Sequence, residues 1–136
     1  MTPLEYKTEI SASSEKIWDA LCNKESYTEW SGGNRYEGNW TEGTEMKFLD
    51  PKNNGMYNLV ERHTPDRELT MKHLGWIYDG NSDPQDWTDS RISYLLQPND
   101  FVSELTVKVN SLDEFVDFYN GYIPKILQKI KEIAER

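Results

Sequence analysis

The two histidines are the side chains in this sequence best suited to acid–base chemistry. His73 falls among the strand positions expected to face the interior, and Asn58 could face it from the neighbouring strand. A buried imidazole can act as a general base, orient a ligand, or simply form hydrogen bonds within a core. His63 is expected to be exposed near the Pro65 turn. Strand alternation places the two histidines on opposite faces, so we predict no metal site.

Recognised catalytic motifs are missing from the sequence. It has neither a Gly-x-Ser-x-Gly elbow nor a glycine-rich phosphate loop. Carboxylates pair at Asp83 and Asp86 and at Glu42 and Glu45, but these lie in polar turns where solvation is expected. Cys22 follows apolar helix residues and is expected to be a small buried hydrophobe. We therefore predict no catalytic residue and no cofactor.

Large apolar side chains gather in residues 30–48, with the sequence W-S-G-G-N-R-Y-E-G-N-W-T-E-G-T-E-M-K-F. Trp30, Tyr36, Trp40, Met46 and Phe48 stand beside two glycine-marked turns. Rings at this density either pack in a core or wall a pocket, and Tyr and Trp bring polar atoms that need partners when buried. The sequence leaves both interpretations open.

Composition restricts the classes of function. Acidic residues outnumber basic ones by 24 to 15, giving a formal charge of −9 without a basic stripe, which excludes nucleic acid as an expected partner. The single cysteine permits no intramolecular disulfide. The N-terminus has no basic start and apolar run typical of a signal peptide, and no apolar stretch approaches the roughly 20 residues of a membrane span. We expect a cytoplasmic protein, monomeric or weakly homodimeric.

The predicted elements begin with a strand and two short helices. Residues 4–10 alternate as a half-buried strand does. Serines at 11–14 offer caps for a helix whose apolar face spans 17–22. A second helix is expected at 25–30, closed by two glycines.

A period of two then runs through the middle of the chain. Predicted strands are 35–40, 44–49, 55–63, 68–78, 90–97 and 101–109. Their short connections indicate antiparallel neighbours. The acidic segment 79–89 is predicted to be a mobile hairpin tip. Gly75 could host a bulge that flips the strand phase and turns Trp76 and Tyr78 inward.

The last element is a long amphipathic helix. Ser111 and Glu114 match a capping box, and an apolar stripe continues from there to residue 133. Pro124 is expected to kink or break this helix near Gly121. Together the elements predict an α+β domain in which a bent sheet packs on the last helix.

Several motifs carry a family resemblance. Residues 10–21 are similar to "I-x-A-x-x-E-x-V-W-x-A-L", 37–44 to "G-D-W-x-x-G-S", 60–69 to "V-x-x-x-x-P-x-R-x-L", and 121–127 to "G-W-x-x-x-L". The chain thereby resembles the START/SRPBCC superfamily, which has the helix-grip fold of birch-pollen-allergen-like proteins. Within it, the chain looks most like the group related to the activator of the heat-shock protein ninety ATPase. Tyr122 replaces the Trp usual in the last motif.

The resemblance implies one START/SRPBCC-like domain over residues 1–136, with a curved antiparallel sheet of about six or seven strands. It also implies an apolar ligand cavity between the sheet and the C-terminal helix. Strand alternation and the helical stripe select the residues that could face that cavity. The candidate ligand-binding residues are Trp30, Trp40, Met46, Phe48, Met56, Asn58, Met71, His73, Trp76, Tyr94, Phe115, Tyr119 and Tyr122.

Three functions are consistent with this interpretation. The first is a binding domain that encloses an apolar or aromatic, lipid-like small molecule. The second is an interaction module that assists a chaperone ATPase. The third is a cyclase-like or hydrolytic enzyme that uses the same cavity, for which only His73 and the tyrosines offer polar groups. A continuous cavity beneath the last helix favours binding or catalysis, whereas a filled interior contradicts both.

Overall fold

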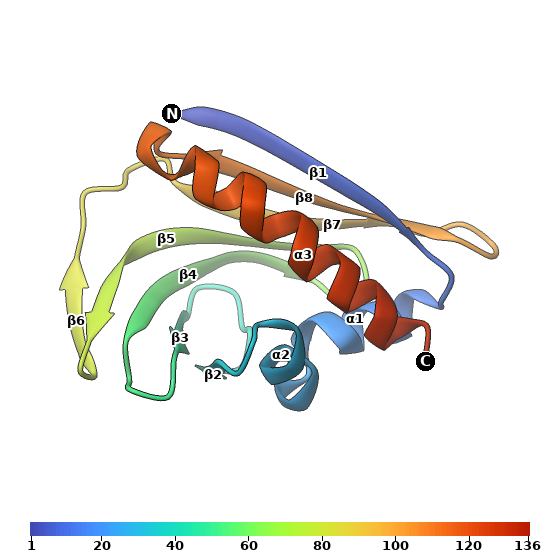
Figure 1. The fold of residues 1–136 in the computed structure, drawn as a ribbon, viewed down its shortest axis with the longest axis horizontal. Helices are drawn as coiled ribbons and strands as arrows, with labels where there is room; N and C mark the ends of the chain where they lie inside the picture. The colour runs from blue at the N-terminus through green and yellow to red at the C-terminus, as the bar shows by residue number, and fades with distance from the viewer.

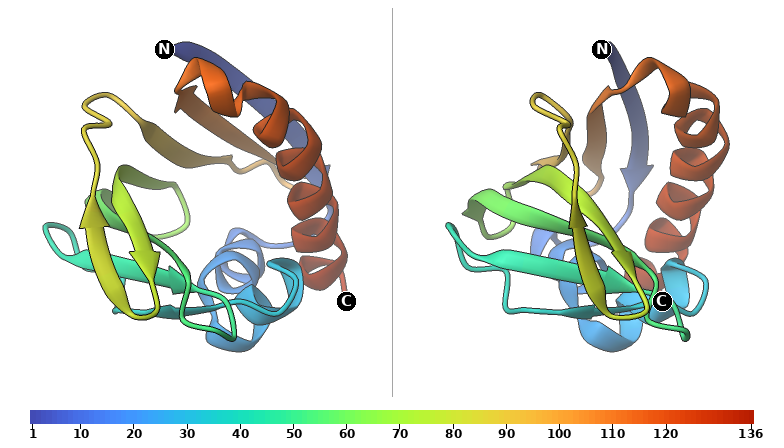
Figure 2. Two further views of the ribbon diagram at one scale, coloured as in Figure 1. Left: turned by 60° about the vertical axis from the view of Figure 1, so that its left-hand side comes forward. Right: turned by 90° about the vertical axis from the view of Figure 1, so that its left-hand side faces the viewer.

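An antiparallel sheet of eight strands wraps around one long C-terminal helix, α3, in the computed structural model, which describes residues 1–136. The strand order is β1-β8-β7-β5-β4-β3-β2, with β6 beside β5. Figures 1 and 2 show the sheet curving around the helix, while α1 and α2 lie near the C-terminal end of α3.

The strands are β1 (Thr2–Ile10), β2 (Arg35–Glu37), β3 (Glu45–Leu49), β4 (Gly55–Thr64), β5 (Glu68–Tyr78), β6 (Asn81–Pro84), β7 (Arg91–Gln97) and β8 (Ser103–Ser111). The helices are α1 (Ser14–Cys22), α2 (Lys24–Trp30), the 3₁₀ turn η1 (Asp113–Phe115) and α3 (Val116–Ala134). None of these helices combines the length and the apolar character that a membrane-spanning helix requires.

The N-terminal elements form as their sequence predicts. Side chains of β1 alternate between half-buried and exposed along the whole strand. Ser13 caps α1 by accepting a hydrogen bond from the Lys16 amide, and Asn23 caps α2 through the amides of Glu25 and Ser26. Asn23 is also the C-cap residue of α1, so the second helix begins directly after the first.

The predicted bulge in β5 is present and changes which residues face inward. Tyr57 of β4 pairs with Gly75, whereas Asn58 pairs with His73, so Leu74 is the extra residue. After the bulge, Trp76 turns to the same side as His73. Ile77, the next residue, packs in a small cluster with Leu49 and Tyr57 and also borders the cavity.

Residues 79–89, predicted to be a mobile hairpin tip, contain a tight hairpin turn and a further strand. Asp79 and Gly80 both have positive φ, which suits the two-residue turn of a tight hairpin. The chain then returns as β6 and pairs with the end of β5 from Tyr78↔Asn81 to Gly75↔Pro84. Every residue of β6 is exposed, so the strand lacks the apolar alternation that reveals a half-buried strand in sequence.

Gly75 is required by the close approach of β6. A Cβ at this position would lie 2.4 Å from the carbonyl oxygen of Asp83. Gly75→Ala is expected to lower the free energy of unfolding by about 1–3 kcal/mol through overpacking. Gly121→Ala is the matched control, because a Cβ there meets nothing within 4 Å and Ala favours a helix by roughly 0.5–1 kcal/mol. Urea unfolding measures both, and equal stabilities of the two variants would contradict the close approach.

The predicted capping box at Ser111 is wrong. Ser111 is the last residue of β8, pairs with Thr2 of β1, and donates its hydroxyl hydrogen to the Leu112 carbonyl at 2.7 Å. Its backbone is therefore held as strand rather than as a helix N-cap. The chain enters α3 through η1, whose first residue, Asp113, accepts a 2.6 Å hydrogen bond from the Thr2 hydroxyl.

Of the kink or break expected near Gly121, the break does not occur. α3 continues as one element through Pro124, as Figure 1 shows. Buried side chains on both sides of the proline pack against the core, from Tyr119 to Ile130. Proline has no amide hydrogen to donate to the Asn120 carbonyl. Pro124 and Asn120 lie on the exposed face of the helix, where water can donate a hydrogen bond to that carbonyl instead. Packing of the apolar face therefore outweighs the missing hydrogen bond.

Candidate ligand-binding cavity

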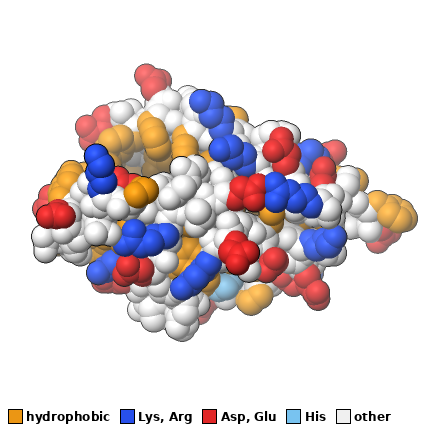
Figure 3. All heavy atoms as spheres, turned by 60° about the horizontal axis from the view of Figure 1, so that its bottom comes forward, with side chains coloured by type: hydrophobic (Ala, Val, Ile, Leu, Met, Phe, Trp, Pro, Cys, Tyr) orange, Lys and Arg blue, Asp and Glu red, His pale blue; other side chains and the backbone are white.

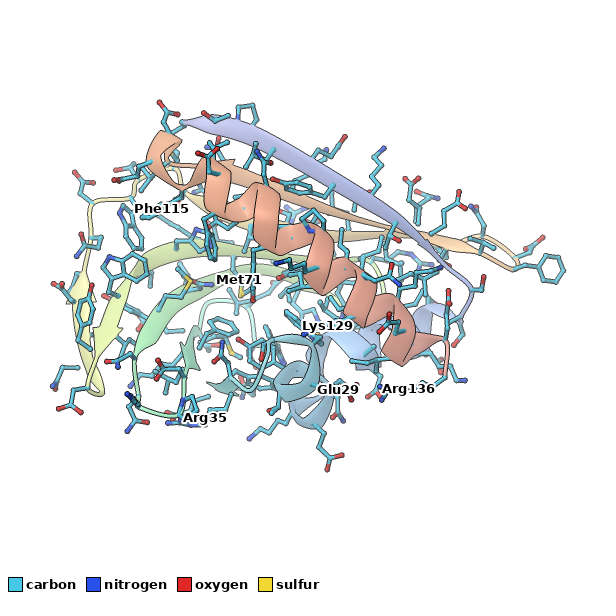
Figure 4. The ribbon with its side chains drawn as sticks, in the orientation of Figure 1. Glu29, Arg35, Met71, Phe115, Lys129 and Arg136 are labelled. Carbon is cyan, nitrogen blue, oxygen red and sulfur yellow. The ribbon has the colours of Figure 1, made fainter.

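A cavity of about 630 Å³ lies between the concave face of the sheet and α3. Twenty of its 27 lining residues are hydrophobic. Figure 3 shows a hollow among hydrophobic side chains, and in Figure 4 Met71 lies beneath α3, with Phe115 near the start of the helix. Small-molecule sites commonly measure roughly 300–1,000 Å³. The interior of this domain therefore has space of the size that a small organic ligand needs.

The structure brings all but one of the candidate binding residues to this cavity. Those on its wall are Trp30, Trp40, Phe48, Met56, Asn58, Met71, His73, Trp76, Tyr94, Phe115, Tyr119 and Tyr122. Met46 is the exception and is fully buried in the core. The turn 38–44 folds over it, and its sulfur accepts a hydrogen bond from the Trp40 amide at 3.3 Å. That the lining residues bind a ligand remains a prediction.

The wall includes further residues that the sequence did not indicate, and four of them carry rings or a hydroxyl group. Tyr27 comes from α2, Ser90 precedes β7, Trp87 follows β6 and Phe118 begins α3. Trp87 is a large apolar ring in an acidic segment, and this contrast in the sequence could have indicated that it is a wall residue. Phe118 is 58% exposed and stands outside the buried stripe of the helix, so periodicity gave no indication of it.

The stretch 30–48 serves as both core and pocket. Trp30, Trp40 and Phe48 line the cavity, whereas Tyr36 packs behind them. Tyr36 meets Trp40 edge-on at 4.8 Å between ring centroids, and Trp40 lies 5.9 Å from Phe48. The Trp40 indole nitrogen and the Tyr36 hydroxyl both donate to the Cys22 carbonyl, at 3.2 and 2.5 Å. These bonds attach the turn after β2 to the end of α1.

The opposite end of the cavity opens among aromatic rings. Trp76, Trp87 and Phe115 meet edge to face, with centroids 5.0–6.2 Å apart. Phe118 stacks on Tyr122 at 5.1 Å. Because Phe118 is both exposed and part of the lining, the cavity reaches the surface there. A ligand would enter past flat apolar faces.

His73 and Ser90 form the most buried polar pair on the wall. The His73 Nδ1 and the Ser90 hydroxyl lie 2.7 Å apart, and the His73 amide donates to the Ser90 carbonyl at 2.9 Å. Asn58 is the cross-strand neighbour of His73, and its Oδ1 is buried from solvent without a hydrogen-bond partner. Such an orphaned group costs roughly 1–3 kcal/mol. The pair and the amide place polarity at one point of a largely apolar wall.

Burial lowers the pKa of His73 to about 4, from 6.5 for an ordinary imidazole. The folded protein therefore keeps His73 neutral while the unfolded chain takes up a proton below pH 6.5. Stability from this group is present above pH 6.5 and is lost as pH falls toward 4, by up to about 1.4 kcal/mol per pH unit. Unfolding free energies measured between pH 7 and 4.5 should show this slope, and His73→Gln should flatten it. Identical pH profiles of the two proteins would contradict the assignment.

His63 is not exposed as predicted, but half-buried. The Trp18 indole donates to its Nε2 at 3.0 Å, so Nδ1 carries the hydrogen and donates to the Trp40 carbonyl, also at 3.0 Å. The side chain thus links α1 to the cavity wall at Trp40. Its partners are separate from those of His73, and no group of three or more His, Cys, Asp or Glu residues in the structure could hold a metal ion.

A curved antiparallel sheet that grips a C-terminal helix, with short helices after the first strand, defines a helix-grip domain. More narrowly, the chain belongs to the family described as Activator of Hsp90 ATPase homolog 1-like protein, whose family model matches residues 11–134. No curated protein sequence matches the chain.

Solved structures share this architecture at low sequence identity. The Aha1 dimer from Colwellia psychrerythraea has a TM-score of 0.79 at 21% identity, over 99% of this chain and 97% of its own. Protein MLL2253 from Mesorhizobium loti has a TM-score of 0.78 at 17% identity, over 99% of this chain and 98% of its own. DynU16, described as a putative protein in the dynemicin biosynthetic locus, has a TM-score of 0.77 at 12% identity, over 98% of this chain and 47% of its own. At these identities the likeness extends to the fold alone.

Proposed function

We propose that this protein binds a small, largely apolar molecule, lipid-like or aromatic, between its sheet and α3. The observation that carries the proposal is the cavity of about 630 Å³, with 20 hydrophobic residues among its 27 lining residues. Membership of a family built on the helix-grip fold supports a small ligand-binding domain in general terms. Transfer of apolar surface from water contributes about 25 cal/mol per Å² and supplies the affinity.

The polar groups of the wall would orient such a ligand. His73 is held by Ser90 through Nδ1, which leaves Nε2 free to meet a polar atom of the ligand. A neutral imidazole whose pKa is about 4 is a weak base, so this geometry supports orientation rather than proton abstraction. Binding is therefore better supported than the cyclase-like or hydrolytic alternative.

A direct test uses the neutral apolar dye N-phenylnaphthylamine, whose fluorescence rises when it leaves water. We expect saturable enhancement with one dye per protein and loss of the signal when urea unfolds the domain. A competing apolar molecule extracted from the host should displace the dye. Absence of saturation, or several dyes per protein, would contradict an enclosed site.

A second candidate is an interaction module for a chaperone ATPase, which the family's description favours. It predicts a complex with the ATPase at tens of micromolar, measurable by sedimentation velocity. No complex at those concentrations would contradict it. Sedimentation of the isolated protein also tests the expected monomer or weak homodimer.

A further inference from the structure

The cavity contains hydroxyl groups that the protein itself does not use. Tyr94 of β7 and Tyr119 and Tyr122 of α3 all line it, and their hydroxyls form no hydrogen bond within the protein. Tyr94 is 6% exposed and Tyr119 is 9% exposed. Asn58 Oδ1 is the single buried side-chain atom that is both unpartnered and sealed. The three hydroxyls therefore reach the open space of the cavity.

These hydroxyls come from opposite walls of the cavity, because Tyr94 belongs to the sheet and the other two tyrosines belong to the helix. Burial, and after it the phenols of Tyr122, Tyr27 and Tyr119, raise the pKa of Tyr94 well above its ordinary value. Burial, with Tyr122 as the next cause, raises the pKa of Tyr119 to about 12. At neutral pH each phenol keeps its hydrogen and can donate it to an acceptor.

The wall offers nothing to neutralise an anion. No Lys or Arg lines the cavity, and its one acidic residue is Asp50. The Asp50 carboxylate already accepts hydrogen bonds from the amides of Lys52 and Asn54 at 2.8 and 3.0 Å, as part of a turn. A ligand carboxylate or phosphate would lose its hydration without gaining a cation, which is strongly unfavourable.

The apolar part of the wall favours a flat molecule. Trp76, Trp87 and Phe115 present perpendicular ring faces, and Phe118 lies nearly parallel to Tyr122 at an interplanar angle of 19°. Planar ring systems can stack against one such face while meeting the edge of another. Long flexible chains gain less from rigid faces because they lose more conformational freedom on binding.

We propose that the ligand is an uncharged molecule with a planar ring system and a carbonyl oxygen, which accepts one or two hydrogen bonds from the hydroxyls of Tyr94, Tyr119 and Tyr122. This inference rests on the proposed function and specifies its ligand class. It excludes free fatty acids and phospholipids as preferred ligands. Removal of the Tyr94 hydroxyl leaves no protein group without a partner, so Tyr94→Phe should fold as the natural protein does.

Three probes with one skeleton test the proposal: fluorene, fluorenone and fluorene carboxylate, each measured by displacement of N-phenylnaphthylamine. Fluorenone should bind about fivefold to tenfold more tightly than fluorene, as expected for one or two hydrogen bonds. Tyr94→Phe and Tyr122→Phe should reduce this ratio, because fluorene has no oxygen for a hydroxyl to meet. Tyr57→Phe is the matched control, because Tyr57 is buried with Leu49 and Ile77 and does not line the cavity. It should preserve the ratio.

The outcomes separate this inference from the proposed function. Equal binding of fluorene and fluorenone, or binding of the carboxylate as tight as that of fluorenone, would overturn the ligand class while the cavity still binds apolar molecules. A ratio unchanged in both Tyr94→Phe and Tyr122→Phe would also overturn it. Failure of the natural protein to bind any probe or the dye would overturn the proposed function, and this inference with it.

Discussion

Met56→Trp is expected to weaken binding of any cavity ligand by about tenfold or more. Met56 lies on β4 between Phe48 of β3 and Trp76 of β5, and its side chain lines the cavity. An indole at this position would occupy space that the ligand needs. Because the wall has open volume to receive the ring, the variant should stay folded, with an unfolding free energy close to that of the natural protein. Titration with N-phenylnaphthylamine measures the loss.

Leu59→Trp provides the matched control for that substitution. Leu59 is on the same strand, three residues further on, between Glu45 and Lys72, and it does not line the cavity. It gains a ring of the same kind on the outer face of the sheet. Leu59→Trp should bind the dye with the same affinity as the natural protein. Equal losses in both variants, or none in either, would show that the dye does not occupy the space beneath α3.

Trp40→Ala is expected to lower the free energy of unfolding by about 3–5 kcal/mol. The substitution removes ring contacts with Tyr36 and Phe48 and the hydrogen bond to the Cys22 carbonyl. Trp40 also has a φ of 62°, which a residue with a Cβ adopts only with strain. Trp40→Gly loses the same contacts but relieves that strain. It should be more stable than the Ala variant by about 1 kcal/mol.

Chemical unfolding of the two Trp40 variants checks both parts of this prediction. Trp87→Ala is a suitable comparison, since Trp87 also lines the cavity but is only half-buried and lies at its open end. It should cost clearly less stability. If the Ala variant equalled or exceeded the Gly variant in stability, backbone strain at Trp40 would be contradicted.

Much of the fold could be predicted because local rules and tertiary packing agree. Alternation in β1, the serine cap of the first helix and the bulge beside Gly75 are each encoded by a few neighbouring residues. Ser111 shows where local rules fail. Its spacing to Glu114 matches a helix cap, yet pairing of β8 with β1 holds it in the sheet. Pro124 does not break α3 for a similar reason, since residues on both sides of it pack in the core.

The cavity wall was predictable where strand parity applies and not elsewhere. Met71, His73 and Tyr94 follow from alternation alone, and Trp76 follows once the bulge is allowed. Met46 satisfies the same parity but is covered by the turn 38–44, which no periodicity describes. Trp87 reaches the wall because β6 returns along β5, and β6 carries no apolar pattern. Tertiary arrangement thus decides the residues at both ends of the cavity.

Native mass spectrometry tests most directly whether the space beneath α3 holds a small apolar molecule. The natural protein and Met56→Trp would be incubated with the same organic-solvent extract of the host and measured side by side. The natural protein should carry the added mass of one small molecule, and Met56→Trp should retain little or none of it. No added mass on the natural protein, or equal added mass on both proteins, would contradict an enclosed binding site in this cavity.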